Sequence, residues 1–127
     1  MFLNFKNATK KQKTFMENVF WFAKNELLPR HKNLEINVIM EKDSDLDGCV
    51  YECDDREYEM TIKKELTGDD LITCIFHEFK HIEQDIRKRY DIHVINDVPY
   101  MERPYEIEAF EAQEKMLKKY KKTVALS

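Results

Sequence analysis

The feature that most constrains the fold of this chain is a helical stretch between Thr67 and Tyr90. Thr67 is expected to be the N-cap residue, and Asp70 stands at the N3 position of a capping box. Apolar side chains then recur at three- and four-residue steps, at Leu71, Ile72, Ile75, Phe76, Phe79, Ile82, Ile86 and Tyr90. This spacing predicts a long amphipathic helix that packs one broad apolar face against the rest of a core.

The other side of this helix carries the pattern H-E-x-x-H, as His77-Glu78-x-x-His81. Residues four apart on a helix lie one turn, about 6 Å, above one another. Two imidazoles so placed can bind one Zn²⁺, each through a single ring nitrogen. The carboxylate of Glu78 would lie close enough to act as a general base towards water at the metal. The alternative is a polar helix face that carries two histidines by chance.

Length and composition limit the class of protein that contains this helix. The 127 residues are expected to form one domain, 1–127, and 43% hydrophobic residues favour a folded globule. The net charge of −4 gives no general attraction to nucleic acid, and no apolar run is long enough for a signal peptide or a membrane span. Three cysteines without C-x-x-C spacing indicate reduced thiols, so we expect a cytoplasmic protein without nucleic-acid or membrane partners.

The remaining periodicity predicts an α+β fold with a small three-stranded twisted sheet. A first helix is expected from Ala8 to Leu28, where Pro29 ends it. A last helix is expected from Pro104 to about Tyr120, after an irregular segment with a short strand considered around Ile92–Ile95. Alternation predicts three strands, Leu34–Met40, Cys49–Cys53 and Tyr58–Lys63.

The acidic segment Asp43–Gly48 superficially resembles a calcium-binding loop, because aspartates alternate before a glycine. An EF-hand loop beginning at Asp43 would need Glu at its twelfth place, which is Asp54. No flanking helices are predicted either, so we expect an ordinary turn between strands.

A catalytic zinc site needs a third protein ligand. The metzincin pattern would place Gly and His where Gln84 and Arg87 stand, which excludes that class. On the last helix, Glu106 projects inside the apolar face, and Glu108 is the runner-up because it lies beside Ala112. A carboxylate there is costly unless it is paired or bound to a metal. Glu106 is therefore the expected ligand, and a salt bridge from Glu106 to Arg103 is the alternative.

His77-Glu78-x-x-His81, followed about 25 residues later by Glu106-Ile107-Glu108-Ala109, resembles the compact gluzincin metallopeptidases, including the HtpX-like and ImmA/IrrE-like families. The stretch Arg103–Ala109 is also similar to small H-E-x-x-H proteins encoded by bacteriophages, which would imply the host cytoplasm. The resemblance covers residues 71 to 117. It implies a minimal zincin-like fold, with His77, His81 and Glu106 as zinc ligands and Glu78 as the general base.

The resemblance has one departure. Related families place an Asp four residues after the ligand Glu, where it supports a ligand histidine; that position here is Phe110. Another group must then support the histidines, and Asp85 is a candidate because it lies one turn beyond His81.

The expected activity is zinc-dependent hydrolysis of a peptide or protein substrate. The strand Tyr58–Lys63 would be an edge strand that takes up an extended peptide. A donor to the oxyanion is expected from His93, Tyr100, Arg103 or Tyr105, and the sequence does not choose among them. Two rivals remain: a zinc-binding regulatory or adaptor domain with little peptidase activity, and a SprT-like DNA-associated protease. The oligomeric state is not readable from the sequence.

Overall fold

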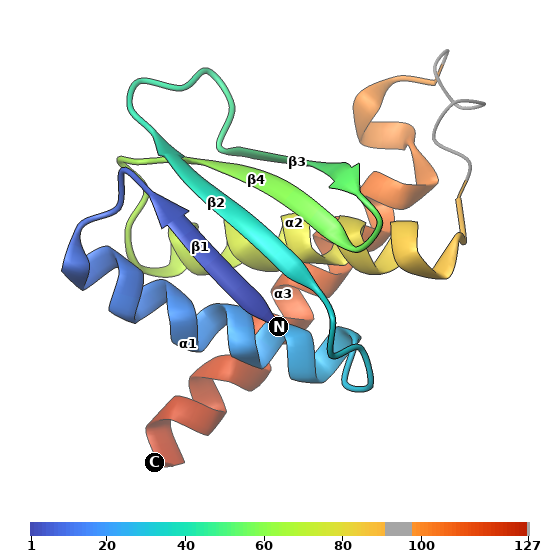
Figure 1. The fold of residues 1–127 in the computed structure, drawn as a ribbon. Helices are drawn as coiled ribbons and strands as arrows, with labels where there is room; N and C mark the ends of the chain where they lie inside the picture. The colour runs from blue at the N-terminus through green and yellow to red at the C-terminus, as the bar shows by residue number, and fades with distance from the viewer. Residues whose placement is uncertain (91–97, 127) are drawn as a thin grey trace.

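A computed structural model describes residues 1–90 and 98–126 of the chain. The described part is an α+β fold, as predicted, with three α-helices, one short 3-10 helix and one mixed sheet of four strands (Figure 1). The strand considered around Ile92–Ile95 lies outside the described residues. The elements in chain order are β1 (Phe2–Lys6), α1 (Lys10–Leu27), β2 (Glu35–Glu41), β3 (Gly48–Asp54), β4 (Glu57–Lys63), α2 (Gly68–Arg87), η2 (Tyr100–Glu102) and α3 (Pro104–Leu126).

The sheet has the strand order β1-β2-β4-β3. β1, β2 and β4 run parallel, while β3 pairs with β4 in the antiparallel sense. Parallel neighbours need a crossover connection, and α1 supplies it between β1 and β2. The fourth strand, β1, was not expected, because five residues paired across such a crossover leave no hairpin signal in the sequence.

The prediction that Tyr58–Lys63 forms an edge strand is wrong. That segment, β4, lies between β2 and β3, and β3 is the edge. Burial explains the order, because Tyr58, Met60 and Ile62 are at most 2% exposed, whereas most of β3 is exposed.

The helices cover one face of the sheet (Figure 1). Alternate residues of β2 and β4 point into the core, where they meet apolar side chains of α1 and α2, including Phe20, Phe76 and Phe79. The rings of Phe20 and Phe79 lie 6.3 Å apart, which ties α1 to α2. α3 packs on α2, and this pairing positions the site described below.

The N-termini of α1 and α2 are capped differently. Thr9 and Gln12 form a capping box at α1, with side-chain to backbone bonds of 3.0 and 2.9 Å. At α2 the expected cap position is correct, but the Thr67 side chain makes no capping bond. Gly68 follows with φ of 55°, a left-handed conformation that favours glycine.

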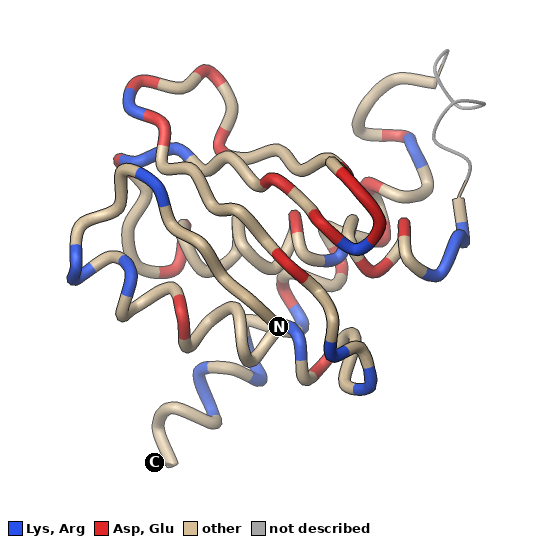
Figure 2. The backbone as a smooth tube through the Cα atoms, viewed as in Figure 1, with Lys and Arg blue, Asp and Glu red and all other residues tan. Residues whose placement is uncertain are grey.

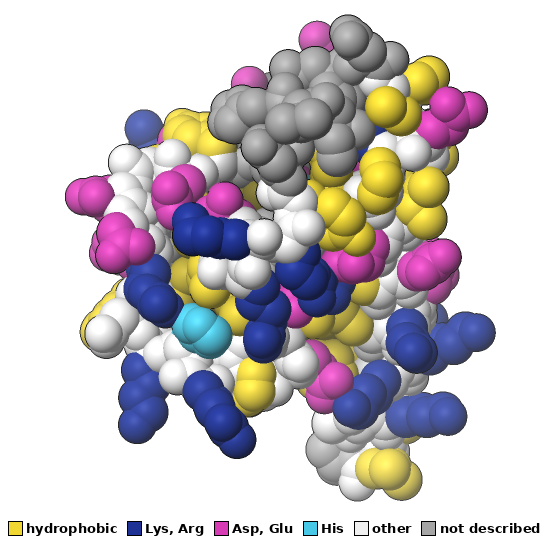
Figure 3. Space-filling view, turned by 90° about the vertical axis from the view of Figure 1, so that its right-hand side faces the viewer, with side chains coloured by type: hydrophobic (Ala, Val, Ile, Leu, Met, Phe, Trp, Pro, Cys, Tyr) yellow, Lys and Arg dark blue, Asp and Glu magenta, His cyan; other side chains and the backbone are white. Residues whose placement is uncertain are grey.

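Basic side chains gather at the end of the molecule where α1 and α2 finish (Figure 3). Arg87 donates to the Leu27 carbonyl at 3.0 Å, and Lys24 donates to the Pro29 carbonyl at 2.9 Å. Burial and the positive charges of Arg56, Arg87 and Lys24 lower the pKa of His31. These cations complement the negative ends of two helix dipoles.

Cys49, Cys53 and Cys74 are free thiols, in agreement with the sequence. Among the helices of the described segments, none combines the length and the apolar character needed to cross a membrane.

Candidate metal centre

α2 and α3 bring together three side chains that lie far apart in sequence. The Nε2 atom of His77 lies 3.3 Å from Glu106 Oε1, and the Nε2 atom of His81 contacts the same oxygen. Glu106 is 2% exposed and His77 is 6% exposed, so the contact is buried. The helical registers used to choose Glu106 therefore place it beside both motif histidines.

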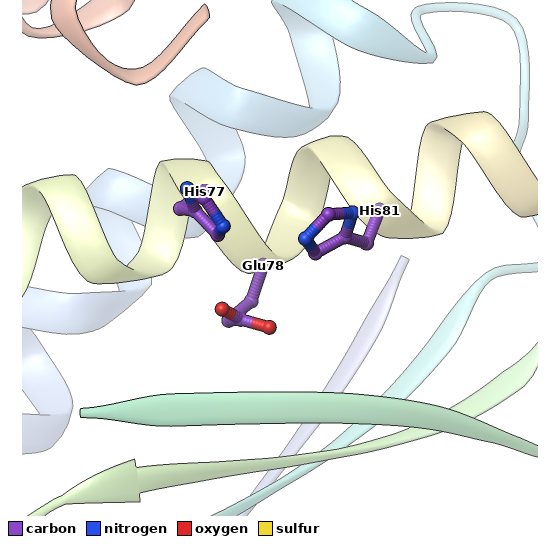
Figure 4. A group of neighbouring side chains, drawn as sticks. All are labelled: His77, Glu78 and His81. Atoms are coloured by element: carbon purple, nitrogen blue, oxygen red, sulfur yellow. The ribbon is translucent and has the colours of Figure 1, made fainter. Parts of the chain in front are cut away.

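Glu78 extends from α2 towards the sheet, with the two histidine rings on either side of it along the helix (Figure 4). A potential ligand atom of Glu78 lies within 4.8 Å of one on each histidine. Glu78 also meets the start of β3, where a Cβ on Gly48 would come 3.2 Å from Glu78 Cγ and 2.6 Å from Cys74 Sγ. The close approach to Cys74 Sγ favours glycine at this position, where β3 meets α2.

Two glutamines hold the far sides of the histidine rings. Gln113 Oε1 lies 2.8 Å from His77 Nδ1, and Gln84 Oε1 lies 2.8 Å from His81 Nδ1. The Gln84 amide is oriented by its own donor bonds, to the Tyr105 carbonyl at 3.0 Å and to Glu108 at 3.1 Å. Because an amide oxygen only accepts, both Nδ1 atoms carry the proton.

This tautomer determines what the other ring nitrogens can do. In neutral His77 and His81, each Nε2 presents a lone pair towards the carboxylate oxygen of Glu106. Three electron-pair donors that face one another in a buried site repel unless a positive charge lies between them. That charge is either a proton on a ring or a metal ion, and the set of two imidazoles and one carboxylate is a known zinc ligand set.

The pKa shifts of the metal-free site follow from these contacts. For Glu106, burial disfavours the carboxylate, but hydrogen bonds from His77, His81 and Tyr100 outweigh it and hold its pKa well below the usual range. Burial opposes the charged form of His81, yet hydrogen bonds to Glu106 and Gln84 raise its pKa. Burial raises the pKa of Glu78, against the opposing effect of the two histidines. Glu78 is thus the stronger base of the two carboxylates, and Glu106 is the better anionic ligand.

The groups that support the histidines are not those expected. Asp85 instead accepts a hydrogen bond from the Tyr58 hydroxyl. Phe110, at the position where the resemblance would imply an Asp, packs its ring against His77 with centroids 4.6 Å apart. Gln113, one turn further along α3, takes the supporting role. The one sign of this role in the sequence is that Gln113 lies three residues after Phe110 and therefore on the same face of the helix.

Glu108, the alternative ligand, and Arg103, the alternative partner of Glu106, both bind other residues. Glu108 accepts hydrogen bonds from Gln84 and Tyr90 and pairs with Lys80 and Arg89. This network holds the C-terminal part of α2 on α3. Arg103, the alternative partner of Glu106, donates to the Val98 carbonyl and to the Tyr105 hydroxyl.

A cavity of about 410 Å³ opens beside His77 and Glu78. Tyr100 lines this cavity, and burial together with a hydrogen bond to Glu106 raises the pKa of Tyr100. The Cζ atom of Arg103 lies over the Tyr100 ring, 5.9 Å from its centroid. Among the expected oxyanion donors Tyr100 is therefore best placed, while His93 lies outside the described residues.

No protein-family model, characterised protein or solved structure matches this chain.

Proposed function

We propose that this protein is a zinc-dependent metallopeptidase, with one Zn²⁺ held by His77, His81 and Glu106. The observation that carries the proposal is the convergence of both Nε2 atoms on a single buried oxygen of Glu106, with both Nδ1 atoms held by glutamines. When bound, zinc would act as a Lewis acid towards the scissile carbonyl and the attacking water.

Glu78 is the proposed general base. It is 8% exposed, lines the cavity, and has no hydrogen-bond partner among the described residues, so its carboxylate is available to a reacting molecule. It takes a proton from the attacking water and passes it to the leaving amine. Burial raises the pKa of the Glu78 carboxyl, which makes it a stronger base than an exposed glutamate. Tyr100 is the proposed donor to the developing oxyanion.

The position of the edge strand β3 favours a peptide as the substrate. Among residues 1–90 and 98–126 it pairs only with β4, and its first residue, Gly48, lies against Glu78. An extended peptide added to the open edge of β3 would pass the general base. Free thiols at all three cysteines support the proposed cytoplasmic location.

The test is a comparison of the parent with Glu78→Gln on unfolded protein substrates, after both have been loaded with zinc. The exchange keeps the shape of the side chain and removes the base, so zinc content should persist. Cleavage should fall by about 10²- to 10⁴-fold. Equal cleavage by both proteins would refute the peptidase mechanism, and zinc binding without any cleavage by the parent would favour the adaptor alternative. Retention on DNA that weakens with salt would favour the SprT-like alternative.

A further inference from the structure

The cavity beside the general base is built from three parts of the chain. α2 contributes one face at helical spacing, with Asp70, Thr73 and His77 among its residues. The loop before β3 forms a second wall, which includes Asp45 and Asp47. α3 and Tyr100 contribute the remaining wall, including Phe110 and Gln113.

This cavity is strongly acidic. The carboxyl groups of Asp45, Asp47, Asp70 and Glu78 line it, and no Lys or Arg is among its described lining residues. Figure 2 shows mainly acidic positions along the loop between β2 and β3, with one basic residue, Lys42, directly after β2. A cavity with one sign of charge attracts groups of the other sign.

The side chains of the three aspartates in the cavity are free to pair with a ligand. Within residues 1–90 and 98–126, the carboxylates of Asp45, Asp47 and Asp70 have no hydrogen-bond or ion-pair partner. The backbone of Asp47 is by contrast anchored, because its carbonyl accepts from the Lys63 amide at 2.8 Å and from the Cys74 thiol at 3.4 Å. This anchoring holds Asp47 next to Gly48 and hence close to Glu78. Glu78 also lines the cavity; it is 8% exposed, and within residues 1–90 and 98–126 its carboxylate has no hydrogen-bond partner, which independently indicates that a ligand enters there.

We propose that this cavity is the subsite for a Lys or Arg side chain next to the scissile bond, recognised by Asp47 from the loop before β3 and by Asp70 from α2. The proposal rests on the peptidase function and names its substrate class: peptides with a basic residue at the cleavage site. Leu46 and Phe110 line the same cavity and would contact the aliphatic stem of such a side chain. The volume of about 410 Å³ accommodates either side chain.

Binding is measured first, so that the result does not depend on turnover. Fluorescein-labelled peptides, identical except for one central Arg, Lys, norleucine or Glu, are titrated with zinc-loaded Glu78→Gln protein and followed by anisotropy. The Arg and Lys peptides should bind about tenfold more tightly than the norleucine peptide, because each of two exposed ion pairs contributes only a few-fold. The preference should shrink as salt is raised, because partly exposed charges are screened.

Matched variants locate the recognition. Asp47→Asn and Asp70→Asn, in the same background, should each reduce the Arg-to-norleucine ratio by at least about threefold. Asp43→Asn lies in the same loop and Asp69→Asn on the same helical turn, but neither residue lines the cavity. These two controls remove the same charge and should leave the ratio unchanged. The double variant Asp47→Lys, Asp70→Lys should shift the preference to the Glu peptide.

The outcomes separate the two proposals. Equal binding of all four peptides, no binding of any peptide, or loss of preference in the controls as well would overturn the subsite. If the parent cleaves these peptides without regard to charge, the peptidase function stands and the subsite falls. If basic peptides bind selectively through Asp47 and Asp70 but the parent cleaves none, the cavity is a binding site for basic side chains, and the peptidase function falls together with the placement of this site beside a scissile bond.

Discussion

Replacing Gln113 by Met tests whether the support of His77 tunes the metal site. Gln113 Oε1 accepts from His77 Nδ1 at 2.8 Å, and its amide nitrogen donates to Glu114 at 3.2 Å. Met has a similar length but offers no comparable acceptor, so His77 loses the bond that sets its tautomer and its ring orientation. Loss of such a partner typically lowers metal affinity by about 10- to 100-fold, or about 1.4 to 2.7 kcal/mol.

The fold itself should hardly respond to this exchange. Gln113 is only partly buried, so water can take over the bond to the ring. We expect the metal-free protein to lose less than about 1 kcal/mol of stability in chemical denaturation. Zinc affinity is measured by competition with a chromogenic chelator, at one fixed pH, for the parent and the variant.

Two further variants make the result decisive. Gln113→Glu retains an acceptor and should bind zinc at least as tightly as the parent. Glu114→Gln changes only the exposed neighbour and should have no effect. Parent-like affinity in Gln113→Met, together with loss of zinc in His77→Ala, would refute the supporting role of Gln113.

Three other predictions concern the same site. Although burial opposes it, hydrogen bonding to Glu106 raises the pKa of His81 in the metal-free protein. Protonation of His81 therefore stabilises the metal-free form. This stabilisation is fully present below about pH 6.5 and is lost as the pH rises through the raised pKa of His81. Excess chelator should thus lower the melting temperature in calorimetry more at about pH 8 than at about pH 6. Gly48→Ala places a Cβ 3.2 Å from Glu78 Cγ and should slow peptide cleavage by about ten- to a hundredfold at unchanged zinc content. Tyr100→Phe should lower kcat by about 10²- to 10³-fold in steady-state assays on zinc-saturated protein, beyond the loss of zinc affinity expected from the missing hydrogen bond to Glu106.

Local patterns in the sequence predicted the helices well. The apolar periodicity from Leu71 to Tyr90 predicted α2, and Pro29 and Pro104 marked where α1 ends and where α3 begins. These signals lie within a few residues of the structure they report. The position of Glu106 on an apolar stripe followed from the same periodicity, and the structure places it beside both motif histidines.

Features that depend on tertiary pairing were not predicted. β1 forms only because β2 lies beside it, far along the chain, and the order of β3 and β4 depends on which strand the core buries. The expectation that Asp85 supports a histidine failed for a related reason. Carboxylates are the more familiar partners of ligand histidines, but Tyr58 on β4 engages Asp85, and the amides of Gln84 and Gln113 lie closer to the rings.

The most direct test of the account is the zinc content of the purified protein after dialysis, measured by elemental analysis alongside Glu106→Ala and Glu108→Ala. Glu106 meets both histidines, whereas Glu108 is held by Gln84 and Tyr90. The account predicts one zinc ion per chain in the parent and in Glu108→Ala, and little or none in Glu106→Ala. Zinc retained in full by Glu106→Ala, or absent from the parent even after zinc has been supplied, would contradict it.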